Sequence, residues 1–182
     1  MNRYRGKLTT RPLSRSYELT PELLGRGGYG EVWRGLRTAP QGVTREAVAV
    51  KVVPLPSSEP GATRRGCGRT ELRASLMELE VMARVGHHDS LLTLREAFVE
   101  DGNLYLVTDV METDMCELLM QPGGGHRSHW SELDVCRFMF ALLKGLAHLH
   151  SYGIAHRDVK LDNIMLRRVD DPSSAPLGDF GL

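Results

Sequence analysis

The chain has 182 residues, 41% of them hydrophobic, which is enough to bury a sizeable core in one domain or in one and a half. The 23 basic and 23 acidic side chains cancel, so no overall charge favours nucleic acid or an acidic membrane surface as a partner. No apolar run reaches the roughly 18 residues of a membrane span, and no secretory signal is visible. The three cysteines lack CxxC spacing and indicate free thiols, so we expect a cytoplasmic or nuclear protein.

The first part of the chain predicts a tail followed by a sheet. Residues 1–16 contain five basic side chains and no acidic one, which predicts a basic flexible tail; a docking or targeting arm is the alternative. Across residues 17–53, apolar runs alternate with glycines and turns. Two of these runs, at residues 31–35 and 47–53, predict antiparallel strands.

A loop, a helix and further strands are expected next. Residues 54–69 are rich in Pro, Gly, Ser and Arg and predict a loop. A helix is expected over about residues 70–85, with Thr70 as its N-cap and Gly86 as its stop. A turn at residues 100–103 precedes the last of the following strands. Two or three such strands are expected, from the segments at residues 91–94, 97–99 and 104–107.

A second helix has a clear start signal. Ser131 is expected as N-cap and Asp134 near position N3, with Trp130 facing Val135 across the first turn. This helix should continue to about Ser151. Because it is apolar on most of its faces, we expect it to be buried by elements that the visible chain does not fully supply.

The glycine-rich segment at residues 24–32 is the first candidate for chemistry. Gly25, Gly27 and Gly30 have GxGxxG spacing, and Val32 completes the pattern. Glycines let backbone amides approach phosphate oxygens, although a Rossmann turn or an ordinary hairpin also needs them. A Rossmann fingerprint would be followed by a helix, whereas a strand-like run follows here. The pattern therefore favours a hairpin over phosphates.

Lys51 is a charged residue on an otherwise apolar strand, where a charge needs an anionic partner. Only four of the 23 basic residues are lysines, so a compact ammonium is favoured at this position over a guanidinium. The carboxylate should come from the following helix. Glu80 shares its face with basic residues in a solvated pattern, whereas Glu78 lies among apolar ones. We therefore predict that Glu78 is the partner.

Residues 156–163, with the sequence HRDVKLDN, are the most specific signal in the chain. Asp158 offers a carboxylate that can accept a hydroxyl proton, and Lys160 can hold a transferring phosphoryl group. Asn163 offers an amide oxygen for a cation, and Asp179 begins an Asp-Phe-Gly tripeptide sixteen residues later. The alternative is a charged loop that only caps a helix.

In order and rough spacing, these four motifs resemble the signature set of eukaryotic protein kinases, over residues 17–182. The resemblance implies an α+β, protein-kinase-like fold. Residues 17–111 would form the N-lobe and hinge, with an antiparallel five-stranded sheet and one helix. Residues 112–182 would begin a mainly helical C-lobe that contains the catalytic loop.

The resemblance also implies roles for single residues, with ATP and Mg2+ as cofactors. Asp158 would be the catalytic base, Lys160 would align the phosphoryl group, and Asn163 and Asp179 would hold magnesium. Thr108 would be the gatekeeper, residues 109–111 the hinge that binds adenine through its backbone, and Asp114 a ribose contact. The implied ATP-binding residues are Leu24, Gly25, Arg26, Gly27, Gly28, Tyr29, Gly30, Val32, Ala49, Lys51, Glu78, Asp109, Met111 and Asp114.

Lys160 in this loop is similar to the serine/threonine type of kinase, so the implied partner is a protein substrate with Ser or Thr. The subfamily stays open, because residues 111–114 resemble mitogen-activated kinases and residues 159–166 resemble the protein kinase C and calcium/calmodulin-dependent groups. No activation segment or APE motif follows Leu182. Two alternatives therefore remain, namely a non-catalytic nucleotide-binding regulatory fragment and an incomplete gene product of a kinase.

Overall fold

A computed structural model of the chain describes residues 8–9, 11–27, 30–40, 43–55, 69–120 and 130–180. These residues divide into two compact units, and each is described by itself. Unit 1 contains the described residues up to Arg84 together with Leu94–Val110, and unit 2 contains Val85–Thr93 and Met111–Phe180. Within the described ranges, no helix is both long and apolar enough to cross a membrane.

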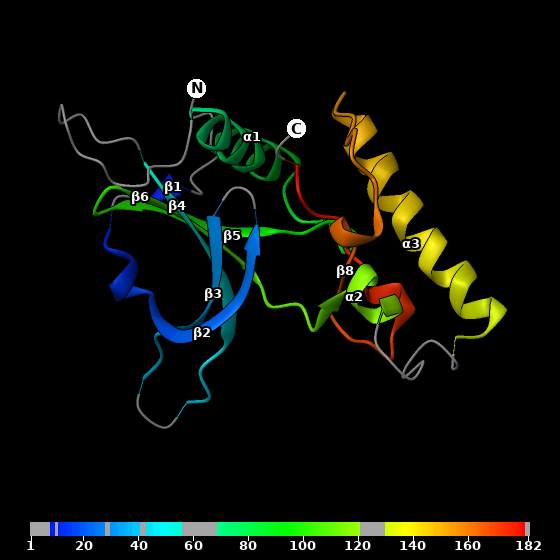
Figure 1. Cartoon of the computed structure of the whole chain (residues 1–182), viewed down its shortest axis with the longest axis horizontal. Helices are drawn as coiled ribbons and strands as arrows, with labels where there is room; N and C mark the ends of the chain where they lie inside the picture. Colours follow the sequence, from blue (N-terminus) through cyan, green and yellow to red (C-terminus); the bar gives the residue numbers. More distant parts are fainter. Residues whose placement is uncertain are drawn as a thin grey trace. The chain divides into compact units, whose positions relative to one another are not determined.

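Unit 1 is built on a six-stranded sheet with the strand order β1-β5-β6-β4-β3-β2 (Figure 1). Its strands are β1 (Leu8–Thr9), β2 (Tyr17–Gly27), β3 (Gly30–Arg37), β4 (Ala47–Pro54), β5 (Leu94–Glu100) and β6 (Asn103–Asp109). All pairings among β2 to β6 are antiparallel, which confirms the predicted five-stranded sheet. The sixth strand, β1, was not expected, and it pairs parallel with β5.

The prediction of a flexible tail is wrong for the described part of residues 1–16. Strand β1 pairs with residues 97–98 on the edge of the sheet. Leu13, in the short helix η1 (Leu13–Arg15), is only 5% exposed and belongs to the core of unit 1. Its backbone N–H donates to the Glu100 carboxylate at 3.0 Å. A single buried leucine and a capped backbone group thus fix a segment whose composition is that of a solvated tail.

Helix α1 (Arg69–Val85) is the one helix longer than a single turn among the described residues of unit 1. It begins one residue before the expected N-cap, so Thr70 lies inside its first turn. Gly86 stops the helix as predicted, with a left-handed φ of +70°. The buried side of α1 includes Glu78, whose charge would be costly there without a partner.

Residues 91–93 form no separate strand before β5, so the structure has two of the two or three strands that were expected here. Leu91 makes only an isolated bridge with Leu177, in unit 2. The turn predicted at residues 100–103 is present, and Gly102 supplies one of its positive φ angles at +73°. Local turn chemistry was therefore easier to predict than the length of a strand.

Unit 2 is mainly helical. Its elements are β7 (Thr113–Asp114), α2 (Met115–Met120), α3 (Glu132–Ser151), η3 (Leu161–Asn163), β8 (Met165–Leu166) and η4 (Pro172–Ser174). The predicted capping box of α3 is present, because Ser131 Oγ accepts from the Asp134 N–H at 3.2 Å and the Asp134 carboxylate accepts from the Ser131 N–H at 2.9 Å. Trp130 packs against Phe138, with ring centroids 5.7 Å apart, and its contact with Val135 stays a prediction.

Helix α3 is buried along one side and exposed along the other. Its buried residues are Phe138, Ala141, Leu142, Gly145 and Leu149. Its exposed large apolar residues are Leu133, Val135, Met139, Phe140 and Leu143. Among the described residues, burial of α3 is therefore confined to one side, whereas its sequence predicted burial of most of its faces.

His88 and His148 stack in unit 2, with ring centroids 4.5 Å apart. Nδ1 of His88 accepts a hydrogen bond from the Ser90 N–H at 3.1 Å, so that nitrogen carries no proton. Burial, and then the charge of His148, lower the pKa of His88. The other charged neighbours of His88 are Lys144, His87 and Asp89. Of these, only the acidic one favours the protonated ring.

We therefore expect acid to destabilise unit 2. The folded-state pKa of His88 lies below the value of about 6.5 that it has in the unfolded chain, so the unfolded chain binds more protons at lower pH. The contribution of His88 to stability is present above about pH 6.5 and is lost as the pH falls through the folded-state pKa. Urea unfolding from about pH 8 to pH 5 measures this loss.

A pair of variants isolates the effect of His88. The His88→Phe variant keeps a stacking ring but cannot titrate, so its unfolding midpoint should fall less with acid than that of the wild type. His150→Phe is the matched control, because His150 is exposed at the end of α3 and is not among the charges that act on His88. Equal acid dependence in both variants would contradict the assignment.

Candidate active site

In unit 1, a lysine on the sheet is paired with a glutamate on the helix. Lys51 of β4 donates from Nζ to Oε2 of Glu78 on α1 at 2.5 Å. The two side chains are 19% and 6% exposed, so the pair is largely removed from water. Glu78, and not Glu80, makes this bond, which confirms the pairing predicted from the apolar surroundings of Glu78. The glutamate fixes the ammonium and compensates its charge.

The glycine-rich segment forms the hairpin between β2 and β3, as predicted, and not a strand-to-helix turn. Gly27 pairs with Gly30 across the hairpin. Gly30 has φ +140°, and a Cβ there would lie 2.4 Å from the Val52 carbonyl oxygen, so only glycine fits. Gly28 and Tyr29 lie outside the described residues. The remaining predicted residues are placed on β2 (Leu24, Gly25, Arg26), β3 (Val32) and β4 (Ala49).

Two of the predicted hinge and ribose residues, Asp109 and Asp114, make hydrogen bonds within the protein. Asp109 ends β6, and its Oδ1 accepts from Arg95 Nε at 2.5 Å. Asp114 Oδ1 accepts from the Glu117 N–H at 2.7 Å at the start of α2, and its other oxygen has acceptor capacity for a ribose contact. An aspartate directly before a helix is a common N-cap, so the sequence contains a signal for this role of Asp114. Met111 is half-buried just before β7.

In unit 2, the loop after α3 brings Asp158, Lys160 and Asn163 together. Lys160 Nζ donates to Asp158 Oδ2 at 2.7 Å. Asn163, which is buried, donates from Nδ2 to the main-chain oxygen of Asp158 at 2.8 Å and to its Oδ2 at 3.0 Å. The Lys160 hydrogen bond is the main cause of a lowered pKa at Asp158, and it raises the pKa of Lys160 in return. The Asp158 carboxylate is therefore ionised at neutral pH.

A histidine that had no predicted role anchors this loop. His156 is 5% exposed, and its Nε2 lies 2.8 Å from the Gly178 carbonyl oxygen. Its ring packs edge-on against Phe180, with centroids 5.4 Å apart. The Gly178 N–H donates to the main-chain oxygen of Asn163 at 2.8 Å. These contacts couple residues 156–163 to the Asp-Phe-Gly segment, so the two motifs form one cluster.

Asp179 has a carboxylate oxygen without a protein partner. Its Oδ1 is buried and makes no hydrogen bond to any described residue, which is costly unless a ligand completes it. The residue also has a left-handed φ of +60°, and Arg157 has one of +69°. Such strain in non-glycine residues is concentrated at functional sites.

The side chains of Asn163 and Asp179 fit a magnesium ion better than a metal such as zinc. The two hydrogen bonds of the Asn163 side chain to Asp158 both use Nδ2, which leaves its oxygen for a cation. The described residues contain no group of three or more His, Cys, Asp or Glu that could hold a metal. Magnesium is typically held by one or two carboxylates together with waters and substrate phosphates, so few protein ligands suffice.

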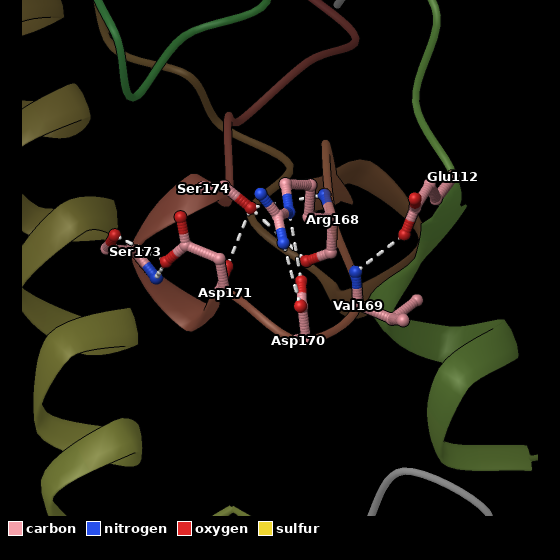
Figure 2. Close-up of polar contacts among 7 residues, drawn as sticks. All are labelled: Glu112, Arg168, Val169, Asp170, Asp171, Ser173 and Ser174. Carbon is pink, nitrogen blue, oxygen red and sulfur yellow. Dashed lines mark hydrogen bonds and ion pairs between the residues drawn. The ribbon is translucent and has the colours of Figure 1, made fainter.

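The segment before Asp179 holds its shape through its own polar contacts (Figure 2). Ser174 Oγ donates to the main-chain oxygen of Asp171 at 2.6 Å and accepts from the Arg168 N–H at 3.2 Å. The Glu112 carboxylate accepts from the Val169 N–H at 2.8 Å. The loop between β8 and the Asp-Phe-Gly segment is thus a defined structure, which the sequence did not predict.

Comparison with known proteins agrees with this geometry. Residues 19–182 match the family described as the protein kinase domain. The chain is 33% identical over 162 residues to serine/threonine-protein kinase PLK4 of Nematostella vectensis, which covers 88% of this chain and 14% of that protein. It is 31% identical to cell division control protein 2 homolog 3 of Trypanosoma brucei brucei, over 88% of this chain and 45% of that protein.

A third relative, cyclin-dependent kinase 15 of Mus musculus, is 31% identical over 90% of this chain and 33% of its own length. The chain thus spans between 14% and 45% of the length of these relatives. The family match covers the glycine-rich hairpin, the lysine–glutamate pair, the Asp158 cluster and the Asp179 segment together. The chain belongs to the protein kinase domain family.

Proposed function

We propose that the chain is the ATP-binding and catalytic-loop portion of a protein serine/threonine kinase, which transfers the γ-phosphoryl group of ATP to Ser or Thr hydroxyls of proteins. The observation that carries this proposal is the cluster around Asp158, an ionised carboxylate with a lysine at 2.7 Å and a buried amide at 3.0 Å. This set of groups is suited to accept a hydroxyl proton and to stabilise phosphate charge.

Unit 1 supplies groups for the nucleotide. Lys51, held by Glu78, would place its ammonium against the α- and β-phosphates. The backbone of the glycine-rich hairpin would cover the phosphates, because its glycines allow close approach. Residues 109–111 would bind adenine through backbone groups, and Asp114 would reach the ribose.

Unit 2 supplies groups for the transfer. Asp158 takes the proton of the substrate hydroxyl while the hydroxyl oxygen bonds to the γ-phosphorus. The bond between that phosphorus and the oxygen bridging it to the β-phosphate breaks, which releases ADP. Lys160 offsets the negative charge of the group in transit. Magnesium, held by Asn163 and Asp179, would neutralise phosphate charge when bound. Most of the rate enhancement would then come from positioning and electrostatics.

Separate assays of binding and transfer test this proposal. The chain should bind Mg-ATP and phosphorylate serine- or threonine-containing peptides in preference to tyrosine-containing ones. Lys51→Met should weaken ATP binding by about tenfold or more, because a charge-assisted hydrogen bond is lost. Lys144→Met is the matched control, since this lysine is exposed on α3.

The two assays separate the alternatives. ATP binding without any transfer would support the non-catalytic nucleotide-binding fragment in place of the enzyme. Absence of ATP binding in the wild-type chain, or equal effects of Lys51→Met and Lys144→Met, would contradict the proposal as a whole.

A further inference from the structure

Arg95 occupies an irregular position in the sheet of unit 1. On one side of it Leu94 pairs with Thr108, and on the other side Glu96 pairs with Val107. Two steps along β5 thus correspond to one step along β6, which makes Arg95 the extra residue of a β-bulge. Bulges commonly redirect a side chain away from the regular alternation of a strand.

The redirected side chain joins three separate segments of unit 1. Arg95 Nε donates to Oδ1 of Asp109, the last residue of β6, at 2.5 Å. Arg95 Nη2 donates to Oε1 of Glu46, just before β4, at 2.7 Å. Arg37, at the end of β3, lies 3.7 Å from the other oxygen of Glu46. Basic and acidic groups therefore alternate from β3 to the end of β6.

The central pair of this network is partly shielded from water. The Arg95 and Asp109 side chains are 27% and 29% exposed. The hydrogen bond to Glu46, followed by that to Asp109, raises the pKa of Arg95, and the same Arg95 hydrogen bond lowers the pKa of Glu46. A planar guanidinium can hold two carboxylates in fixed directions, which a lysine cannot do.

Asp109 is the last residue of β6 with a strand partner. Its register partner is Val48 on β4, and the chain leaves regular structure at Val110. Beyond that pairing, the Asp109 main-chain oxygen accepts from Thr108 Oγ1 at 3.4 Å. The Asp109 side chain is held from the bulge by Arg95.

We propose that Arg95 is a positioning residue for adenine recognition, because its ion pair with Asp109 fixes the main chain that would contact the base. This inference rests on the proposed function, in which residues 109–111 bind adenine through backbone groups. Arg95 itself does not touch the nucleotide. Its loss should therefore weaken binding of the base and leave the phosphate contacts of Lys51 unchanged.

Comparing the affinities for adenosine and for ATP separates contacts to the base from contacts to the phosphates, because adenosine has no phosphates. In Arg95→Met, the dissociation constants of adenosine and ATP should both rise by about the same factor, on the order of fivefold. In Lys51→Met, ATP should weaken and adenosine should not. The dissociation constants of Arg95→Lys should lie between those of Arg95→Met and the wild type. Lysine keeps the positive charge but lacks the planar guanidinium that can hold two carboxylates.

The matched control is Arg45→Met, which removes an exposed ion pair with Glu18 in the same unit and should leave both affinities unchanged. Hydrogen exchange of residues 107–109 should become faster in Arg95→Met and in Asp109→Asn at temperatures where both variants are folded. The asparagine side chain has nearly the shape of aspartate, so Asp109→Asn tests the same ion pair if Arg95→Met does not fold.

The outcomes separate the two proposals. If the wild type binds neither adenosine nor ATP, the proposed function fails and this inference fails with it. If the wild type binds both, and the folded Arg95→Met or Asp109→Asn variant binds adenosine with wild-type affinity, the inference alone is overturned.

Discussion

Replacing Asp158 with asparagine should lower the rate of phosphoryl transfer by about a thousandfold while the affinity for Mg-ATP stays near that of the wild type. The amide has nearly the shape of the carboxylate, and its oxygen can still accept hydrogen bonds from Lys160 and Asn163, which now bond Asp158 Oδ2 at 2.7 Å and 3.0 Å. It cannot take up a proton from the substrate hydroxyl. The expected loss is therefore in kcat and not in nucleotide binding.

Radiolabelled phosphate transfer to a serine-containing peptide and calorimetric titration with Mg-ATP measure the two quantities separately. Asp170→Asn is the matched control, because this aspartate lies in the loop before Asp179, is 65% exposed and should not alter either quantity. Full transfer activity in Asp158→Asn would overturn the assignment of the base. An equal loss in Asp170→Asn would show that charge near the loop, and not the position of Asp158, matters.

Local sequence signals predicted much of the fold. The capping box at Ser131 and Asp134 depends on atoms three residues apart, and it is present. The hairpin around Gly30 likewise depends on short-range backbone geometry. The choice of Glu78 over Glu80 succeeded because one face of a helix is either apolar or charged, and that difference is visible in sequence.

Features that depend on distant contacts could not be predicted. The segment around Leu13 is held by Glu100 and by the core of unit 1, and composition alone suggested a tail. Nothing in the motif around His156 indicates that its ring would bond the Gly178 carbonyl. The bulge at Arg95 inserts one extra residue between the pairs at Leu94 and Glu96, and no residue type in β5 marks the place of that insertion.

Gly145 is where packing in unit 2 leaves no room for a side chain. A Cβ at this position of α3 would lie 2.6 Å from the Ser90 carbonyl oxygen and 3.1 Å from a methyl group of Leu91. The nearer atom belongs to the backbone, so the segment must move as a whole. Gly145→Ala should destabilise unit 2 by about 2 kcal/mol, because an overpacking cost of up to ~3 exceeds the gain of about 1 from helix propensity.

The same variant should also disturb the proposed magnesium ligands. The Ser90 carbonyl accepts from the Leu177 N–H at 3.0 Å, and Leu177 is two residues before Asp179. Displacing Ser90 therefore shifts the segment that carries Asp179. We expect Gly145→Ala to lower both the unfolding midpoint and the magnesium dependence of ATP binding. Lys144→Ala, at the neighbouring exposed position, should change neither, and a Gly145→Ala variant as stable as Lys144→Ala would show that α3 can move away from Ser90 at no cost.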